Sequence, residues 1–121
     1  LESEAIKNVD YRFKTFDREV LSPYTDIYNE IDDESLDFIF VDGKNRGICA
    51  LLGIKKLKKG GWIIIDDVHR YLPSKSKTPL AINSLEQIPN SHWKEYYKQT
   101  QSWEYKWVSN GISDTAFYLK R

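Results

Sequence analysis

A strand, a helix and a second strand are predicted from one central stretch of the chain, and this unit constrains the fold more than any other feature. Residues 36–41 and 62–65 are short apolar runs, and each run is followed by aspartate. Runs of this kind are typical of strands that are buried on both faces, as in a parallel sheet. Between them, Ile48, Leu51 and Leu52 recur at helical spacing, so we predict a helix that joins the two strands.

The two predicted strands carry their acidic residues at the same end. Gly60 and Gly61 are expected to stop the helix, and the connection is long enough for a right-handed crossover between parallel neighbours. Asp42, Asp66 and Asp67 are then expected to lie close together at the carboxyl edge of the sheet. Open α/β sheets bind ligands beyond this edge, so the sequence predicts a functional site there.

The remaining residues predict further strands and helices around this unit. Asn110-Gly111 has the composition of a hairpin turn, and residues 69–79 contain two prolines and a basic, serine-rich run that predict a surface loop. The predicted elements are a strand at residues 9–16, a helix that begins at Ser22-Pro23, helices at residues 80–88 and 91–100, and strands at residues 103–109 and 115–119.

The composition of the chain limits the classes of partner and the cellular compartment that we expect. Lysine plus arginine equals aspartate plus glutamate, 18 each, so the net charge gives no reason to expect a nucleic acid or an anionic membrane as a partner. No apolar run reaches the length of a membrane span, and none resembles a signal peptide. The single cysteine, Cys49, has no second cysteine to pair with, which favours a reducing compartment. We therefore expect a cytoplasmic protein with a small-molecule substrate.

The chain begins at Leu1 and contains no methionine. We expect that the 121 residues form a single partial domain, residues 1–121, of a longer protein.

The central stretch resembles a known family. The pattern LDFIFVDG at residues 36–43, followed by a helix and by LKKGGWIIIDD at residues 57–67, resembles the second half of a class I S-adenosylmethionine-dependent methyltransferase. This resemblance covers residues 9–121 and implies an α/β fold with a Rossmann-like, mostly parallel sheet, helices on both faces and a C-terminal antiparallel hairpin. It also implies that Asp42 lies at the reaction centre and that Asp17 contacts the adenine of the cofactor S-adenosylmethionine.

Two parts of the family pattern have no counterpart in these residues. The glycine-rich first turn that approaches the cofactor is missing, as is the acidic residue that ends the second strand, because none of the six glycines forms that turn. The N-terminal strands and the cofactor loop are therefore expected to be absent, and the chain alone is expected to bind the cofactor poorly and to be inactive. The first of the two central strands would present an open apolar edge, through which we expect a homodimer to form.

The acidic edge also resembles that of catechol-type O-methyltransferases, which hold a magnesium ion there. By this resemblance Asp42, Asp66 and Asp67 would be the metal ligands, and oxygen ligands suit magnesium. The metal would activate a hydroxyl of a small molecule or sugar, and Lys44 or His69 would accept its proton.

Each of these residues also has a structural interpretation. The aspartates are common turn and capping residues, and Lys44 and Arg46 could simply balance their charge. The aromatic residues late in the chain, among them Tyr105 and Trp107, are interpreted first as core and cross-strand pairs, and otherwise as a stacking platform for a sugar or base.

Two other classes of protein remain open. Residues 62–67 also resemble the magnesium-binding strand of a P-loop nucleotide hydrolase, although no phosphate-binding loop precedes them in the sequence. The chain could instead be a non-enzymatic α/β module that self-associates through an open sheet edge.

Overall fold

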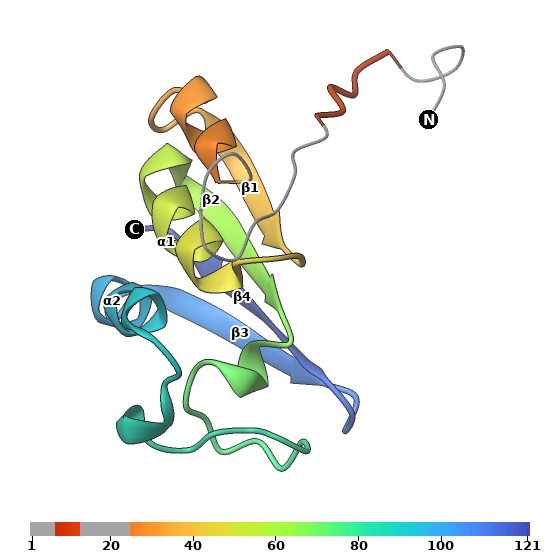
Figure 1. Cartoon of the computed structure of the whole chain (residues 1–121), viewed down its shortest axis with the longest axis vertical. Coiled ribbons are helices and arrows are strands. Elements are labelled where there is room, and N and C mark those ends of the chain that lie inside the picture. Colours follow the sequence, from red (N-terminus) through yellow and green to blue (C-terminus); the bar gives the residue numbers. More distant parts are fainter. Residues whose placement is uncertain (1–6, 13–24) are drawn as a thin grey trace.

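The computed structural model describes residues 7–12 and 25–121. These residues form a mixed α/β fold with one four-stranded sheet and two α helices (Figure 1). The strands are β1 (Leu36–Val41), β2 (Leu57–Asp66), β3 (Glu104–Ser109) and β4 (Asp114–Leu119), the α helices are α1 (Arg46–Lys56) and α2 (Ser91–Gln99), and the short 3-10 helices are η1 (Asp26–Glu30), η2 (Val68–Arg70) and η3 (Leu85–Gln87).

The strand order is β1-β2-β4-β3, which confirms the central strand-helix-strand unit and the closing hairpin. β1 and β2 are parallel, and Val41 pairs with Ile65, so both strands end at the same edge of the sheet. β4 runs antiparallel to β2 and to β3. Among the described strands only one pair is therefore parallel, in contrast to the mostly parallel sheet that the sequence predicted.

Both α helices lie next to each other on one face of the sheet (Figure 1). Gly47 in α1 allows the close approach, because a Cβ atom there would lie 2.9 Å from the indole ring of Trp93 in α2. Below the helices lies a continuous apolar core, whose burial is the main stabilising contribution to the fold. It consists of Ile39, Val41, Ala50, Leu57, Ile63, Ile65, Val68, Leu72, Ile88, Trp93, Tyr96, Trp103, Ala116 and Tyr118.

The opposite face of the sheet remains largely open in the described part of the chain. Phe38 and Phe40 on β1 are 63% and 57% exposed, and Trp62 on β2, which pairs with Phe38, is also exposed. Large aromatic side chains that lie together on a surface mark a region that contacts another segment or molecule. The expected helices on both faces are thus not seen in the described residues.

We predicted that the glycine pair at residues 60 and 61 ends the preceding helix, and this prediction is wrong. Leu57 already has extended backbone angles (φ −82°, ψ 137°), and β2 begins there. The two glycines lie inside β2, at an irregularity where the pairing shifts from Leu36–Leu57 to Phe38–Trp62. β2 has three extra residues at this point, and the two glycines form part of the bulge that accommodates them.

Other sequence predictions also need correction. The helix predicted at residues 80–88 is wrong, because Leu80 has a positive φ of 73° and only the short η3 forms. The helix predicted from Ser22 appears as η1 within its described part. The strand predicted at residues 9–16 is not formed at residues 9–12, and its remainder lies outside the described residues. The helix at residues 91–100 is confirmed, and its N-cap is Asn90, whose side chain accepts a hydrogen bond from Trp93 N.

The closing hairpin is confirmed with its predicted turn. Asn110 Oδ1 accepts hydrogen bonds from the backbone N–H groups of Ile112 and Ser113, at 2.8 and 2.9 Å. An asparagine side chain that bonds to the backbone in this way stabilises a tight turn. No helix in the described residues has the length and apolar character of a membrane span.

Candidate functional site

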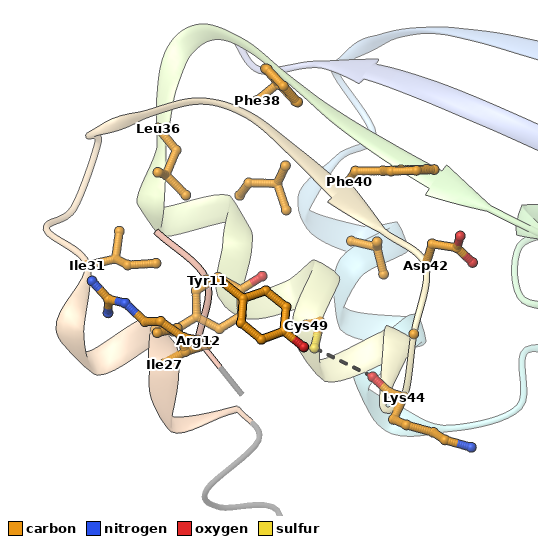
Figure 2. Close-up of a pocket in the computed structure, with 14 residues that line it drawn as sticks. Tyr11, Arg12, Ile27, Ile31, Leu36, Phe38, Phe40, Asp42, Lys44 and Cys49 are labelled. Atoms are coloured by element: carbon orange, nitrogen blue, oxygen red, sulfur yellow. Dashed lines mark hydrogen bonds between the residues drawn. The ribbon is translucent and has the colours of Figure 1, made fainter. Parts of the chain in front are cut away.

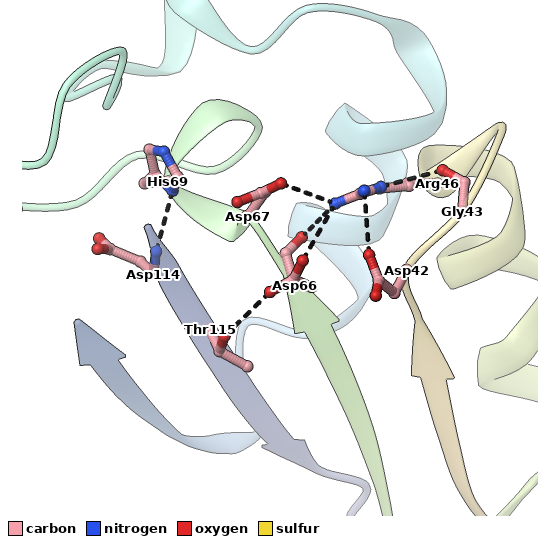
Figure 3. Close-up of polar contacts among 8 residues, drawn as sticks. All are labelled: Asp42, Gly43, Arg46, Asp66, Asp67, His69, Asp114 and Thr115. Atoms are coloured by element: carbon pink, nitrogen blue, oxygen red, sulfur yellow. Dashed lines mark hydrogen bonds and ion pairs between the residues drawn. The ribbon is translucent and has the colours of Figure 1, made fainter. Parts of the chain in front are cut away.

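Arg46 brings the three predicted aspartates together (Figure 3). Asp42 follows β1, Asp66 ends β2, and Asp67 comes next in the chain. Their carboxylates lie around the Arg46 guanidinium, at 3.1 Å for Asp42, 3.8 Å for Asp66 and 3.3 Å for Asp67. The prediction that the acidic ends of the two strands meet at one edge is therefore confirmed.

Backbone carbonyls complete the set of groups around Arg46. Its Nε donates to Gly43 O at 3.0 Å, and its Nη1 donates to Asp66 O at 2.9 Å. Arg46 is the first residue of α1, and its side chain is 18% exposed. It therefore joins the loop after β1 to the end of β2, and the planar guanidinium is suited to several acceptors at once. The second carboxylate oxygen of Asp66 accepts a hydrogen bond from Thr115 on β4.

The aspartates as placed do not fit a magnesium site. The cationic guanidinium of Arg46 lies among the oxygens that would have to bind the metal. Within the described residues, no group of three histidine, cysteine, aspartate or glutamate side chains is arranged to hold an ion. The interpretation that Arg46 balances the charge of the aspartates is the one that the geometry supports.

His69 is corrected from a candidate base to a structural residue. Its side chain is 2% exposed, and its Nδ1 accepts a hydrogen bond from Asp114 N at 3.2 Å. The imidazole lies beyond Asp67 on the β4 side of the site, apart from Asp42 (Figure 3). A buried ring whose lone pair is already used holds η2 against the start of β4, and it is not available to a substrate.

Of the two remaining candidate residues, Lys44 is within the described part of the chain and Asp17 is not. Lys44 is exposed on the loop after β1, and its side chain extends away from the centre of the neighbouring pocket (Figure 2). Asp17, the predicted contact of adenine, lies outside the described residues.

A pocket of about 540 Å³ lies along the open side of β1 (Figure 2). Its walls are mainly apolar, with Phe38 and Phe40 from β1 and Tyr11 from the N-terminal segment. Asp42 lies at one end, where β1 stops. A volume of this size with few polar groups is typical of small-molecule sites. The pocket and the acidic edge therefore share one carboxylate, Asp42.

Cys49 lines the same pocket from α1. Its Sγ donates to Lys44 O at 3.7 Å, and burial raises the pKa of the thiol to about 11. A thiol with a raised pKa is protonated at neutral pH and is a poor nucleophile. Cys49 therefore acts as a packing residue.

Sequence reasoning missed one feature of this edge. Asn45, the N-cap of α1, adopts a left-handed conformation with φ 50°, and its Nδ2 is buried without a hydrogen-bond partner. It lines a second pocket of about 270 Å³ together with Arg46. The only sequence signal for this conformation was the asparagine itself, which tolerates positive φ better than most residues.

Comparison with profiles of known protein families finds no match, and a search of curated protein sequences also finds none.

Proposed function

We propose that the chain is the C-terminal part of a class I S-adenosylmethionine-dependent methyltransferase fold that methylates a hydroxyl of a small molecule or sugar. The observation that carries this proposal is the position of Asp42. It lies at the carboxyl end of β1, at the mouth of a pocket of about 540 Å³ on the unpaired side of that strand. This is where the resemblance expects both the cofactor and the neighbouring strand.

The sheet supports the proposal in two further ways. The parallel unit of β1, α1 and β2 delivers both acidic strand ends to one edge, and open α/β sheets bind ligands at that edge. The antiparallel hairpin of β3 and β4 then closes the sheet beside β2. A Rossmann-like parallel sheet with helices on both faces is proposed for the whole domain, with the missing strands pairing onto β1.

The uncovered face fits the same proposal. Phe38, Phe40 and Trp62 would be covered by helices that precede Leu1 in a longer protein, and the glycine-rich cofactor turn would come from the same region. Burying one large aromatic side chain stabilises a fold by about 2–3 kcal/mol.

The proposed chemistry needs a carboxylate and a proton acceptor but no metal. S-adenosylmethionine supplies an electrophilic methyl group on a cationic sulfur. The charge of Asp42 suits the cationic groups of that cofactor, and Asp17 would contact its adenine. When the hydroxyl oxygen of the acceptor bonds to the methyl carbon, the carbon–sulfur bond breaks, and the hydroxyl proton must leave. Asp42 would accept that proton, since its carboxylate lies at the end of the pocket, whereas the Lys44 side chain extends away from it.

A titration tests the proposal. The protein with any residues that precede Leu1 is titrated calorimetrically with S-adenosylmethionine and with its demethylated product. We expect binding of both, and we expect Asp42→Ala to abolish methyl transfer. Asp37→Ala is the matched control, because Asp37 is an exposed aspartate on the same strand that pairs with Lys58. Absence of binding heat for both compounds would refute the proposal.

Self-association through β1 is a second candidate, since a specific feature favours it. β1 is a terminal strand of the described sheet, and its exposed aromatic residues Phe38 and Phe40 flank the unpaired edge. We expect a dimer in light-scattering measurements at high concentration, and we expect Phe40→Lys to weaken it. A monomer at every concentration would refute this candidate.

A further inference from the structure

A third cavity, distinct from the two pockets described above, lies at β3, the strand at the opposite end of the sheet from β1. Its volume is about 590 Å³, which is within the range of small-molecule sites. The loop after η2 forms one wall and β3 forms the other. The lining residues are Ser74, Lys75, Ser76, Lys77, Tyr105, Trp107 and Ser109.

Two aromatic rings on β3 form the apolar part of the cavity. Tyr105 is 58% exposed, and its ring stacks on Tyr118, with 5.4 Å between the ring centroids and 25° between the planes. Trp107 lies edge-to-face to Tyr105, with a centroid separation of 6.5 Å. The stacking on Tyr118 fixes the ring of Tyr105 from one side, and the rest of the Tyr105 side chain remains accessible to solvent. A fixed aromatic face of this kind suits a sugar or a planar ring.

A buried carboxylate fixes the orientation of Trp107 and of the loop. Asp114 is fully buried, and its two oxygens accept hydrogen bonds from Trp107 Nε1 at 2.8 Å and from Thr78 Oγ1 at 2.6 Å. Thr78 Oγ1 also lies 3.0 Å from Ser109 Oγ. These contacts join the loop to β3 and β4, so both walls of the cavity are tied to one group.

The loop itself is organised by its serines. Ser74 Oγ accepts a hydrogen bond from Ser76 N, and Ser76 Oγ accepts one from Thr78 N, both at 3.1 Å. Such turns constrain the backbone at Lys75 and Lys77, which alternate with the serines along the loop. The polar wall is therefore formed before any ligand binds, which lowers the entropic cost of binding.

The two lysines carry positive charge that the described residues do not neutralise. Neither Lys75 nor Lys77 takes part in an ion pair within the described part of the chain. Asp114 is the carboxylate to which Thr78 of this loop donates, and it also accepts a hydrogen bond from Trp107. An anionic group such as a phosphate would satisfy the lysines, and the hydroxyl of Ser74, whose oxygen accepts a hydrogen bond from Ser76 N, can donate to one of the phosphate oxygens.

We propose that this cavity binds a ligand that carries a phosphate group on a ring, with the ring stacked on Tyr105 and the phosphate paired with Lys75 and Lys77. Nucleotides and sugar phosphates both have this chemistry. The proposal does not depend on the methyltransferase assignment, because none of its residues belongs to the pocket beside β1.

The test is a calorimetric titration of the 121-residue chain with four probes: uridine diphosphate, glucose 1-phosphate, uridine and inorganic phosphate. We expect at least one of the two ring phosphates to bind at least 10-fold more tightly than uridine and inorganic phosphate. Preference between the first two probes distinguishes a nucleotide from a sugar phosphate. Failure of both ring phosphates to bind, or equal binding of inorganic phosphate, would overturn the proposal.

Variants separate the two halves of the site. Lys75→Ala/Lys77→Ala is expected to weaken binding at least 10-fold, whereas the control Lys94→Ala/Lys98→Ala removes the same charge from exposed positions on α2 and is expected to change it less than 2-fold. Equal effects of the two pairs would overturn the assignment to this cavity.

The aromatic half is tested at Tyr105. Tyr105→Ala is expected to weaken binding by about 5- to 100-fold, as the loss of one stacking contact does. Tyr105→Phe keeps the ring and is expected to restore binding to within about 3-fold. Because Tyr105 is exposed, both variants should fold, which thermal melts will check. Equal binding by Tyr105→Ala and the unmodified chain would overturn the stacking role.

Discussion

Replacement of Arg46 by alanine tests the central feature of the acidic edge. The substitution removes the only cation that the described structure places among Asp42, Asp66 and Asp67, and it also removes the donors to the carbonyls of Gly43 and Asp66. Three carboxylates would then face each other at the ends of β1 and β2. We expect Arg46→Ala to destabilise the fold at neutral pH by more than a surface ion pair would.

The magnitude follows from exposure. Exposed ion pairs contribute about 0.2–1 kcal/mol, whereas hydrogen bonds to charged groups contribute about 1.5–3 kcal/mol. Arg46 is 18% exposed, but the side chains of its partners are 28% to 46% exposed and can regain water after the substitution. We therefore expect a loss of about 2–3 kcal/mol. For a chain of this length 1 kcal/mol corresponds to about 4 °C in Tm, so the expected decrease is about 8–12 °C.

Thermal and urea unfolding, followed by circular dichroism, measure this loss. Arg46→Lys keeps the charge but cannot reach several acceptors in one plane, so we expect an intermediate loss of about 1–2 kcal/mol. Arg70→Ala is the matched control, because Arg70 is an exposed arginine on the adjacent η2, and its replacement should change stability by less than about 0.5 kcal/mol.

Equality of the two alanine variants would refute the reasoning. If Arg46→Ala and Arg70→Ala both remain within about 0.5 kcal/mol of the unmodified chain, the guanidinium contributes no more than an exposed ion pair does.

Three further predictions follow from the packing. Gly47→Ala should destabilise the fold by about 1–3 kcal/mol in urea unfolding, because its methyl group would contact Trp93 at 2.9 Å, and a loss below 0.5 kcal/mol would contradict this. Cys49 should react with a thiol reagent at pH 8 far more slowly than in the unfolded chain, since a pKa of about 11 leaves about 0.1% thiolate; equal rates would contradict this. Burial alone would raise the pKa of Asp114, but hydrogen bonds from hydroxyl groups and from Trp107 hold it below its usual range, so its stabilisation is present above pH 4 and is lost as the pH falls. The stability difference between the unmodified chain and Asp114→Asn should therefore shrink below pH 4 in urea unfolding, and a constant difference would contradict this.

The strand positions could be predicted because their pattern is local. Apolar runs followed by acidic residues predicted β1 and the end of β2, and the turn residues Asn110-Gly111 predicted the hairpin. The packing side of α1 could not be predicted in the same way. Ile48, Leu51 and Leu52 indicated a large apolar stripe, whereas the fully buried positions include Ala50. Small residues are buried where two helices pack closely, and the distance between the helices cannot be derived from the sequence alone.

The acidic edge shows a similar division. Strand order and direction were enough to predict that the carboxylates of Asp42 and Asp66 would meet. Whether a metal ion or an arginine lies between them depends on which side chain the first turn of α1 directs to the site. The sequence shows that Arg46 is a cation close to these aspartates. An arginine side chain can adopt several rotamers, and the sequence does not show that this one contacts the ends of both strands.

β1 links the open face of the sheet to the pocket beside it. Its alternating residues are apolar on both sides, as in a strand that is buried on both faces. The structure buries Ile39 and Val41 under the helices, whereas Phe38 and Phe40 are exposed and line the pocket. A segment or second molecule that covered these two aromatic residues would therefore also close the pocket that ends at Asp42. Whatever covers this face of the sheet therefore also completes the site. Phe40→Lys should accordingly weaken both the contact with the covering segment and the binding of a ligand in the pocket.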